Sequence, residues 1–135
     1  MHGGFSFARS RLVVPVTREH IHMGHARSCT KCAVILALRD ALEAGGWPHW
    51  GLRLTPYACW VEADGLILST SEPWGSEFAR MRPSDLPDGL IDWTMEFDAW
   101  AEQEEEGESD GEYQEPAPTT FVFDMGCFQP IPEPA

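Results

Sequence analysis

The sequence predicts an α+β fold: a four- to five-stranded mixed or antiparallel sheet with two helices on one face and an acidic linker before the last strand. Short runs of β-branched and aromatic residues, bounded by Gly, Pro and Asp, are typical of strands. Two longer segments have the apolar spacing of helices and capping residues at their ends. Helices laid on a sheet bury both kinds of apolar surface in one core, and 135 residues favour one domain.

A strand followed by a short helix is expected at the N-terminal end. Leu12 to Val16 has strand character, and Pro15 favours an edge position because proline cannot donate a ladder hydrogen bond. Thr17 is a suitable N-cap for one or two helical turns over Arg18 to Met23, which Gly24 should end.

The first long helix is expected to run to about Ala44, with Ser28 or Thr30 as its N-cap. Gly45 and the glycine after it should end it, as glycine does at many helix C-termini. The segment Cys32 to Leu38 is apolar on every side, which predicts a helix buried on more than one face.

Three short strands are expected next, at Trp50 to Thr55, Tyr57 to Ala63 and Leu66 to Thr70. Asp64-Gly65 lies between the last two, and Asp-Gly suits a type I′ turn because both central residues need a positive φ. The sequence therefore predicts a hairpin centred on this dipeptide.

A second long helix is expected from Ser84 or Asp85 to near Gln103. Its apolar residues alternate in steps of four and three and predict a buried stripe of Leu86, Leu90, Trp93, Phe97 and Trp100. A separate stripe on the other side is acidic and consists of Asp85, Asp88, Asp92 and Glu96.

The expected domain consists of residues 1–101 and 119–128. Residues 102–118 are acidic, rich in Gly, Ser and Pro, and poor in groups to bury, so a flexible linker is expected there. Thr119 to Met125 is the expected final strand, with a ladder partner that the pattern leaves open. Residues 129–135 contain three prolines and are expected to be a tail.

Part of the sequence resembles a family of small α+β proteins of actinobacteria and actinobacteriophages that have no assigned activity. The resemblance covers about half of the chain. It is carried by Val14 to Thr17, Glu19 to Ile21, Gly24, Cys32 to Leu38, Val61 to Gly65, Leu86-Pro87, Ile91, Phe97-Asp98 and Phe121 to Phe123. It implies the same fold class and no chemistry.

The charge is divided unevenly along the chain. All nine Lys and Arg lie before position 83, together with seven Asp and Glu, whereas residues 83–135 hold fifteen acidic residues and no Lys or Arg. The net charge is −13. This asymmetry disfavours binding of the C-terminal part to nucleic acid or anionic membranes, and allows binding to a basic surface, including one that normally holds nucleic acid. The expected partner-binding residues are Asp85, Asp88, Asp92, Glu96, Glu104, Glu105 and Glu106.

A histidine and cysteine cluster is the expected metal site, if there is one. His22, His25, Cys29 and Cys32 have spacings that could hold zinc in a tetrahedron, whereas packed cysteine and solvated histidines are the simpler interpretation. Cys29 and Cys32 at a helix start also resemble a thiol redox motif, in which the helix dipole and Lys31 would lower a thiol pKa.

The sequence therefore supports a ranked set of functions. The first is a small acidic non-enzymatic binding protein of a kind that a phage can encode. It would dock on a basic site of a host protein as a nucleic-acid mimic or defence-system inhibitor. The second is a small zinc-binding domain, and the third is an enzyme of unknown class, since no catalytic motif is present. No signal peptide or membrane span is recognisable, so a cytoplasmic protein with reduced cysteines is expected, with no cofactor unless zinc binds.

Overall fold

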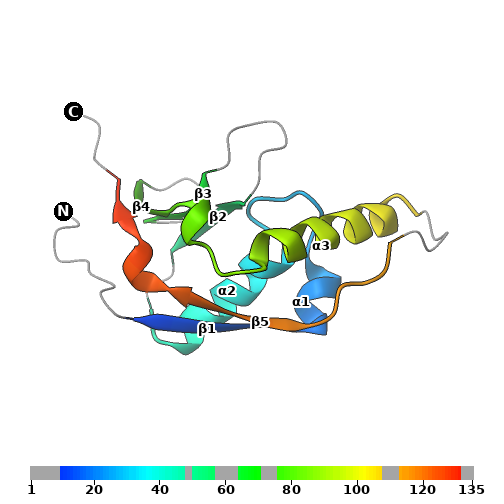
Figure 1. Ribbon diagram of the computed structural model, residues 1–135, viewed down its shortest axis with the longest axis horizontal. Helices are drawn as coiled ribbons and strands as arrows, with labels where there is room; N and C mark the ends of the chain where they lie inside the picture. Colours follow the sequence, from blue (N-terminus) through cyan, green and yellow to red (C-terminus); the bar gives the residue numbers. More distant parts are fainter. Residues whose placement is uncertain (1–9, 48–49, 57–63, 71–75, 108–112, 132–135) are drawn as a thin grey trace.

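The computed structural model describes residues 10–47, 50–56, 64–70, 76–107 and 113–131 (Figure 1). These residues form an α+β fold, which confirms the predicted class. In chain order the elements are β1 (Arg11–Val16), α1 (Arg18–Met23), α2 (Ala33–Ala44), β2 (Gly51–Thr55), β3 (Gly65–Ser69), β4 (Glu77–Met81), the 3₁₀ turn η1 (Pro83–Asp85), α3 (Leu90–Glu105), β5 (Thr119–Asp124), the 3₁₀ turn η2 (Met125–Cys127) and β6 (Gln129–Pro130). None of these helices is long and apolar enough to cross a membrane.

The described strands form two antiparallel sheets, where the sequence predicted one. β1 pairs only with β5, and the second sheet has the order β2-β3-β4-β6. Val14 lies opposite Phe121 and Leu12 opposite Phe123, so β5 pairs with a strand near the other end of the sequence. Such pairing is invisible to local patterns because it joins segments more than a hundred residues apart.

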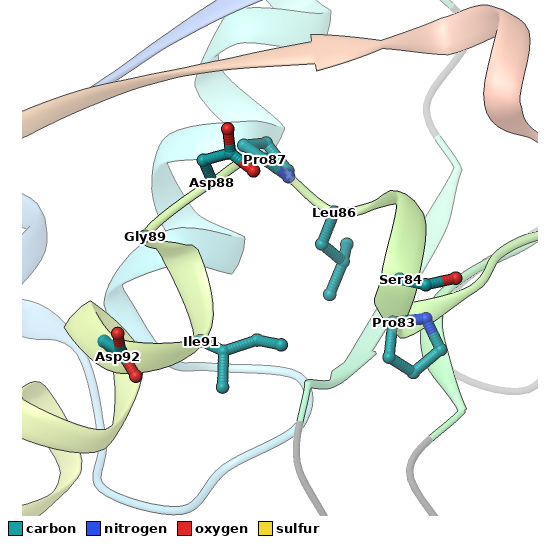
Figure 2. Close-up of a pocket in the computed structure, with 8 residues that line it drawn as sticks. All are labelled: Pro83, Ser84, Leu86, Pro87, Asp88, Gly89, Ile91 and Asp92. Atoms are coloured by element: carbon teal, nitrogen blue, oxygen red, sulfur yellow. The ribbon is translucent and has the colours of Figure 1, made fainter.

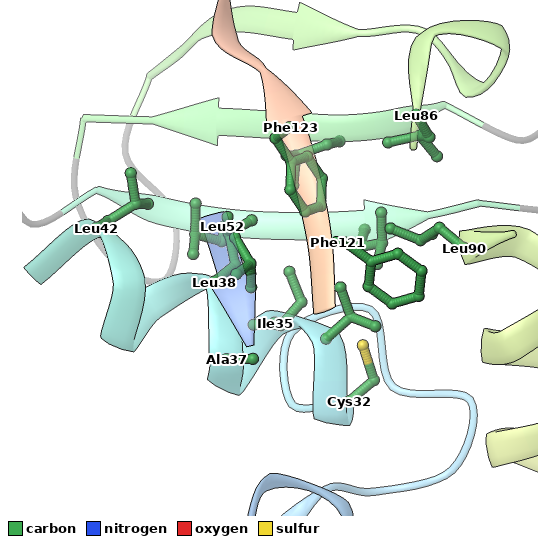
Figure 3. Packing of buried hydrophobic residues seen from close by; sticks show 14 of the residues in the cluster. Cys32, Ile35, Ala37, Leu38, Leu42, Leu52, Leu86, Leu90, Phe121 and Phe123 are labelled. Carbon is green, nitrogen blue, oxygen red and sulfur yellow. The ribbon is translucent and has the colours of Figure 1, made fainter. Parts of the chain in front are cut away.

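The helix α2 lies between the two sheets (Figure 1). It contacts β1 on one side and β2 on the other. This position confirms the burial that its all-round apolar sequence predicted, and it explains why the strands could not form a single sheet with helices on one face. Figure 3 shows side chains from α2, β2, β5 and the start of α3 meeting in one core.

The short helix α1 forms as expected. Thr17 caps it, and His20 completes a capping box by accepting from the Thr17 backbone N–H. Gly24 ends the helix. Close packing requires glycine at this position, because a Cβ would come 2.6 Å from the Ala33 nitrogen and 2.9 Å from the Phe97 ring.

The helix α2 starts later than predicted. Cys32 is its N-cap and makes no side-chain capping bond. Ser28 instead caps the turn before it, accepting from the Lys31 backbone N–H at 3.0 Å. Ser28 therefore caps a separate turn, and α2 begins only after it.

The hairpin predicted around Asp64-Gly65 has its first strand, at 57–63, outside the described residues, and Gly65 itself is the first residue of β3. Gly65 pairs with Thr55, so the connection spans the residues between them. Gly65 has a φ of +83°, and a Cβ there would collide with the Met81 carbonyl oxygen, so close approach of β4 explains this glycine.

Two strands were missed by the sequence analysis. β4 was missed because its charged residues, Glu77 and Arg80, interrupt the apolar pattern. β6 lies in the segment predicted to be a tail, where Gln129 pairs with Arg80 and Pro130 with Ala79. A two-residue bridge that contains a proline has no strand signature, and a neighbouring strand alone decides its conformation.

The helix α3 is shorter at its start than predicted and longer at its end. Residues 83–85 form a separate 3₁₀ turn, and the α-helix begins at Leu90. The apolar stripe is confirmed as core: Phe97 is fully buried, and the Trp93 ring stacks on it at 5.8 Å and 3°. Trp93 also meets Phe121 of β5, edge to face at 6.1 Å.

The acidic segment begins as helix and not as linker. Residues 102–105 belong to α3, and Gln103 is buried. Its side-chain amide exchanges two 3.1 Å hydrogen bonds with the backbone of Tyr113, which pairs the helix end with the returning chain. Pro116 is buried just before β5. Residues 108–112 lie outside the described part, so the mobility expected of a linker stays a prediction.

Candidate functional site: the acidic side of α3

The carboxylates of α3 fall into two groups with different surroundings. Asp98, Glu102 and Glu105 occupy successive turns on one side and hold the loop that follows α1. Asp98 accepts from the Arg27 backbone N–H at 2.9 Å, and Glu102 accepts from the Arg27 Nε at 2.7 Å. Glu105 lies 3.3 Å from both the Ala26 nitrogen and the Nδ1 of His25. This group is engaged inside the molecule.

The loop that these carboxylates hold contains a conformationally costly residue. Arg27 has a φ of +55°, in the left-handed region that non-glycine residues avoid. Asp98, only 5% exposed, receives its backbone N–H. Removing that carboxylate would leave the strained residue without this anchor, so Asp98 has a structural role.

His20 forms a Thr–His–Asp arrangement that no local sequence pattern predicts. Its Nδ1 lies 3.0 Å from the Thr17 nitrogen and 3.1 Å from the Thr17 Oγ1, and its Nε2 lies 2.7 Å from Asp40. Because Nδ1 accepts the backbone N–H of Thr17, its lone pair is already used in the capping box. The arrangement caps α1, and it lacks a free base for hydroxyl activation.

His22 takes part in a clasp with the chain that returns from α3. Its Nε2 lies 2.6 Å from Glu115, whose other oxygen accepts from Arg18 at 2.7 Å. The imidazole also lies 6.2 Å from the Trp100 ring. One carboxylate of the acidic segment is therefore bound by two side chains of α1, Arg18 and His22.

The residues predicted to bind zinc are not gathered into a ligand set. Across residues 10–47, 50–56, 64–70, 76–107 and 113–131, no three His, Cys, Asp or Glu side chains are placed to share a metal ion. His22 and His25 contact different carboxylates, Cys29 is half-buried, and Cys32 is buried under the start of α2.

The thiol of Cys32 does not have the character of a redox cysteine. Burial raises its pKa from 9.0 to about 12, although the backbone N–H groups of Ile35 and Val34 favour the thiolate. A nucleophilic thiol needs the opposite shift. The lowered pKa that a redox motif would need is therefore not found at Cys32, because desolvation of the enclosed thiolate outweighs the helix dipole.

The second group of carboxylates faces solvent and forms what we call the acidic face: Asp88, Asp92 and Glu96. All three are exposed, and no ion pair or hydrogen bond involves their side chains within the described chain. Asp88 precedes the helix, so the face combines a turn with the first two turns of α3.

The other predicted partner-binding residues are placed differently. Asp85 lies in η1 and contacts the Arg82 Nε at 3.3 Å, so it does not continue a helical stripe. Glu104 and Glu106 are exposed at the far end of α3, without a partner in the described chain. Glu105 is engaged with His25 and belongs to the structural group.

A hollow lies beside the acidic face, between η1 and the start of α3. Its volume is about 350 Å³. In Figure 2 the side chains of Leu86 and Ile91 extend into it from two sides, and Asp88 and Asp92 are also among the residues that line it. Pro83, Ser84, Pro87 and Gly89 complete its lining. No sequence pattern predicts this hollow, because it depends on the break between η1 and α3.

Sequence reasoning also missed the roles of Asp98, Gln103 and Glu115. An acidic or amide residue in an acidic stretch carries no signal that separates an internal anchor from a solvated one. No protein-family model, curated protein or solved structure matches this chain, so the resemblance described above stays a prediction and the function has to be inferred from the chain's own residues.

Proposed function

We propose that this chain is a non-enzymatic binding protein that docks its acidic face on a basic site of another protein. The observation that carries the proposal is the contrast between the two groups of carboxylates on α3. Asp98, Glu102 and Glu105 are satisfied internally, whereas Asp88, Asp92 and Glu96 have no counter-charge in the described chain.

Uncompensated surface charge acts mainly on association. Single exposed ion pairs contribute about 0–1 kcal/mol to stability, so the acidic face is not explained by folding energetics. A concentrated field of one sign steers an oppositely charged partner and can raise association rates by about 10–1,000-fold at low salt. The net charge of −13 adds long-range attraction to the same class of partner.

The sharpest form of the proposal is a mimic of nucleic acid. A protein that holds a phosphate backbone presents clustered Lys and Arg, and carboxylates on a rigid helix can occupy the same positions. Nucleic-acid-binding proteins of a host defence system, such as that of a phage-infected cell, are the partner class that this form predicts.

The test compares two double charge reversals with equal change in net charge. Asp92→Lys with Glu96→Lys alters the acidic face, whereas Glu19→Lys with Glu43→Lys alters exposed carboxylates on α1 and α2. Both variants and the unaltered protein are immobilised and exposed to cell extract at low and high salt. Bound proteins are identified, and binding of each purified partner is measured.

The acidic-face variant should lose its partner, and the control should retain it. High salt should weaken binding of the unaltered protein, because exposed charges are screened beyond about 8–10 Å at physiological ionic strength. Duplex DNA or RNA should compete if the partner site normally holds nucleic acid. Equal binding by both variants, insensitive to salt, would rule out the acidic face as the contact surface.

A further inference from the structure

We propose that the hollow beside the acidic face receives an arginine side chain of the partner, an inference that rests on the proposed function. The hollow combines apolar and charged lining residues, and these two features match the two parts of one long basic side chain. Leu86, Ile91 and Pro83 are the apolar residues that line it, and Asp88 and Asp92 are the charged ones (Figure 2).

The size of the hollow suits a single anchoring side chain. Its volume of about 350 Å³ lies at the lower end of the range for small-molecule sites, about 300–1,000 Å³. Long basic side chains lay their methylene stems on apolar surface and keep their charged ends at the polar edge. An arginine entering past Asp88 and Asp92 would bury its stem against Leu86 and Ile91.

The charge of the lining selects a cation. Asp88 and Asp92 contribute two negative charges, and neither has an ion pair in the described part of the chain. The start of α3 contributes the opposing field of a helix N-terminus, equivalent to about half a positive charge. The two carboxylates therefore outweigh the helix dipole, and an anion is disfavoured at this position.

Arginine fits better than lysine for two reasons. The guanidinium group is planar, has five N–H donors and can contact two carboxylates at once, whereas an ammonium is a compact point charge. It is also less strongly hydrated, so placing it against apolar groups costs less. Basic sites that bind nucleic acid are rich in arginine, which is consistent with the proposed partner class.

The experiment uses capped arginine amide as the probe, added to the full-length protein and followed by amide NMR at neutral pH and low salt. Saturable shifts should be confined to Leu86 to Asp92. Capped lysine amide should give weaker shifts at the same positions. Capped citrulline amide keeps the shape without the charge, and it should give none.

Matched variants assign the two parts of the interaction. Asp88→Asn and Asp92→Asn should each weaken the arginine probe by about threefold to tenfold, whereas Glu43→Gln, an exposed carboxylate on α2, should change it less than twofold. Ile91→Ala should weaken arginine while leaving the melting temperature near that of the unaltered protein. Shifts spread over every carboxylate, or equal effects of Asp92→Asn and Glu43→Gln, would overturn the inference.

Failure of this inference is distinguishable from failure of the proposed function. If reversal of Asp92 and Glu96 abolishes partner binding but the arginine probe gives no localised response, the acidic face remains the proposed contact surface and the arginine site is ruled out. If the arginine probe gives a localised response but the reversals leave protein binding unaffected, the arginine site is supported and the acidic face is ruled out as the docking surface.

Discussion

Adjacent residues of α3 differ sharply in their contribution to stability. Phe97 is fully buried between Trp93 and Trp100, whereas Glu96 is exposed. We expect Phe97→Ala to lower the free energy of unfolding by about 3–5 kcal/mol, through lost burial and the cavity that remains. Glu96→Ala should change it by less than about 0.5 kcal/mol. Chemical denaturation of both variants measures the difference, and similar losses would contradict the assignment of core and surface.

The buried thiol of Cys32 predicts a fall in stability at alkaline pH. Below pH 9.0 the thiol is protonated in both the folded and unfolded chain, so its contribution is constant. Between 9.0 and about 12 the unfolded chain releases the proton and the folded chain keeps it. Unfolding is therefore favoured as pH rises, by up to about 1.4 kcal/mol per pH unit.

The measurement is the free energy of unfolding at neutral pH and near pH 10 for the unaltered protein and Cys32→Ala. Other groups titrate in this range, but they contribute to both proteins. The variant should lose less stability than the unaltered protein between the two pH values. Parallel curves would show that the thiol ionises as readily in the folded chain as in the unfolded one.

Zinc content gives a separate prediction for the same region. Because His22 and His25 contact different carboxylates and Cys32 is buried, we expect protein purified without added metal to hold less than about a tenth of an equivalent of zinc. A chelator should leave its melting temperature unchanged. Stoichiometric zinc, or a large drop in melting temperature with chelator, would revive the alternative of a zinc-binding domain.

At the scale of elements, the segment that returns from α3 to β5 makes two kinds of contact, which differ in how much they contribute to folding. Gln103 and Glu115 hold the returning segment to α3 and α1, while β5 buries Phe121 and Phe123 against the core. Truncation before Thr119 should therefore prevent folding, because β1 would lose its only ladder partner among the described strands.

Loss of the clasp should have a milder effect. Gln103→Ala and Glu115→Gln each remove contacts of the returning segment without opening the core. We expect faster amide hydrogen exchange around Tyr113 and a stability loss of about 1–2 kcal/mol. Unchanged exchange at Tyr113 would mean that other contacts hold this segment.

At the scale of the whole molecule, charge opposes compactness. Residues 83–135 hold fifteen carboxylate residues without a Lys or Arg, and several have no internal partner in the described part. Screening this repulsion should stabilise the folded state, so the melting temperature should rise when salt is raised within the physiological range and somewhat above it. A steady fall with added salt would indicate that the internal ion pairs outweigh the repulsion.

The sequence by itself determined the α+β class, the capped helix α1, most of α2 and the apolar stripe of α3. These features depend on local spacing: Thr17 sits beside the helix it caps, and the apolar residues from Leu90 to Trp100 repeat with the helical period. It also determined the excess of acid after position 82, which is a matter of composition.

Only the tertiary structure decided which acidic residues are surface and which are anchors. Asp98 and Glu96 look alike in sequence, yet Asp98 receives the strained backbone of Arg27 and Glu96 faces water. The same holds for β6, which exists because β4 lies beside it, and for the pairing of β1 with β5. Contacts between distant segments depend on how the chain packs as a whole, and local propensity does not predict them.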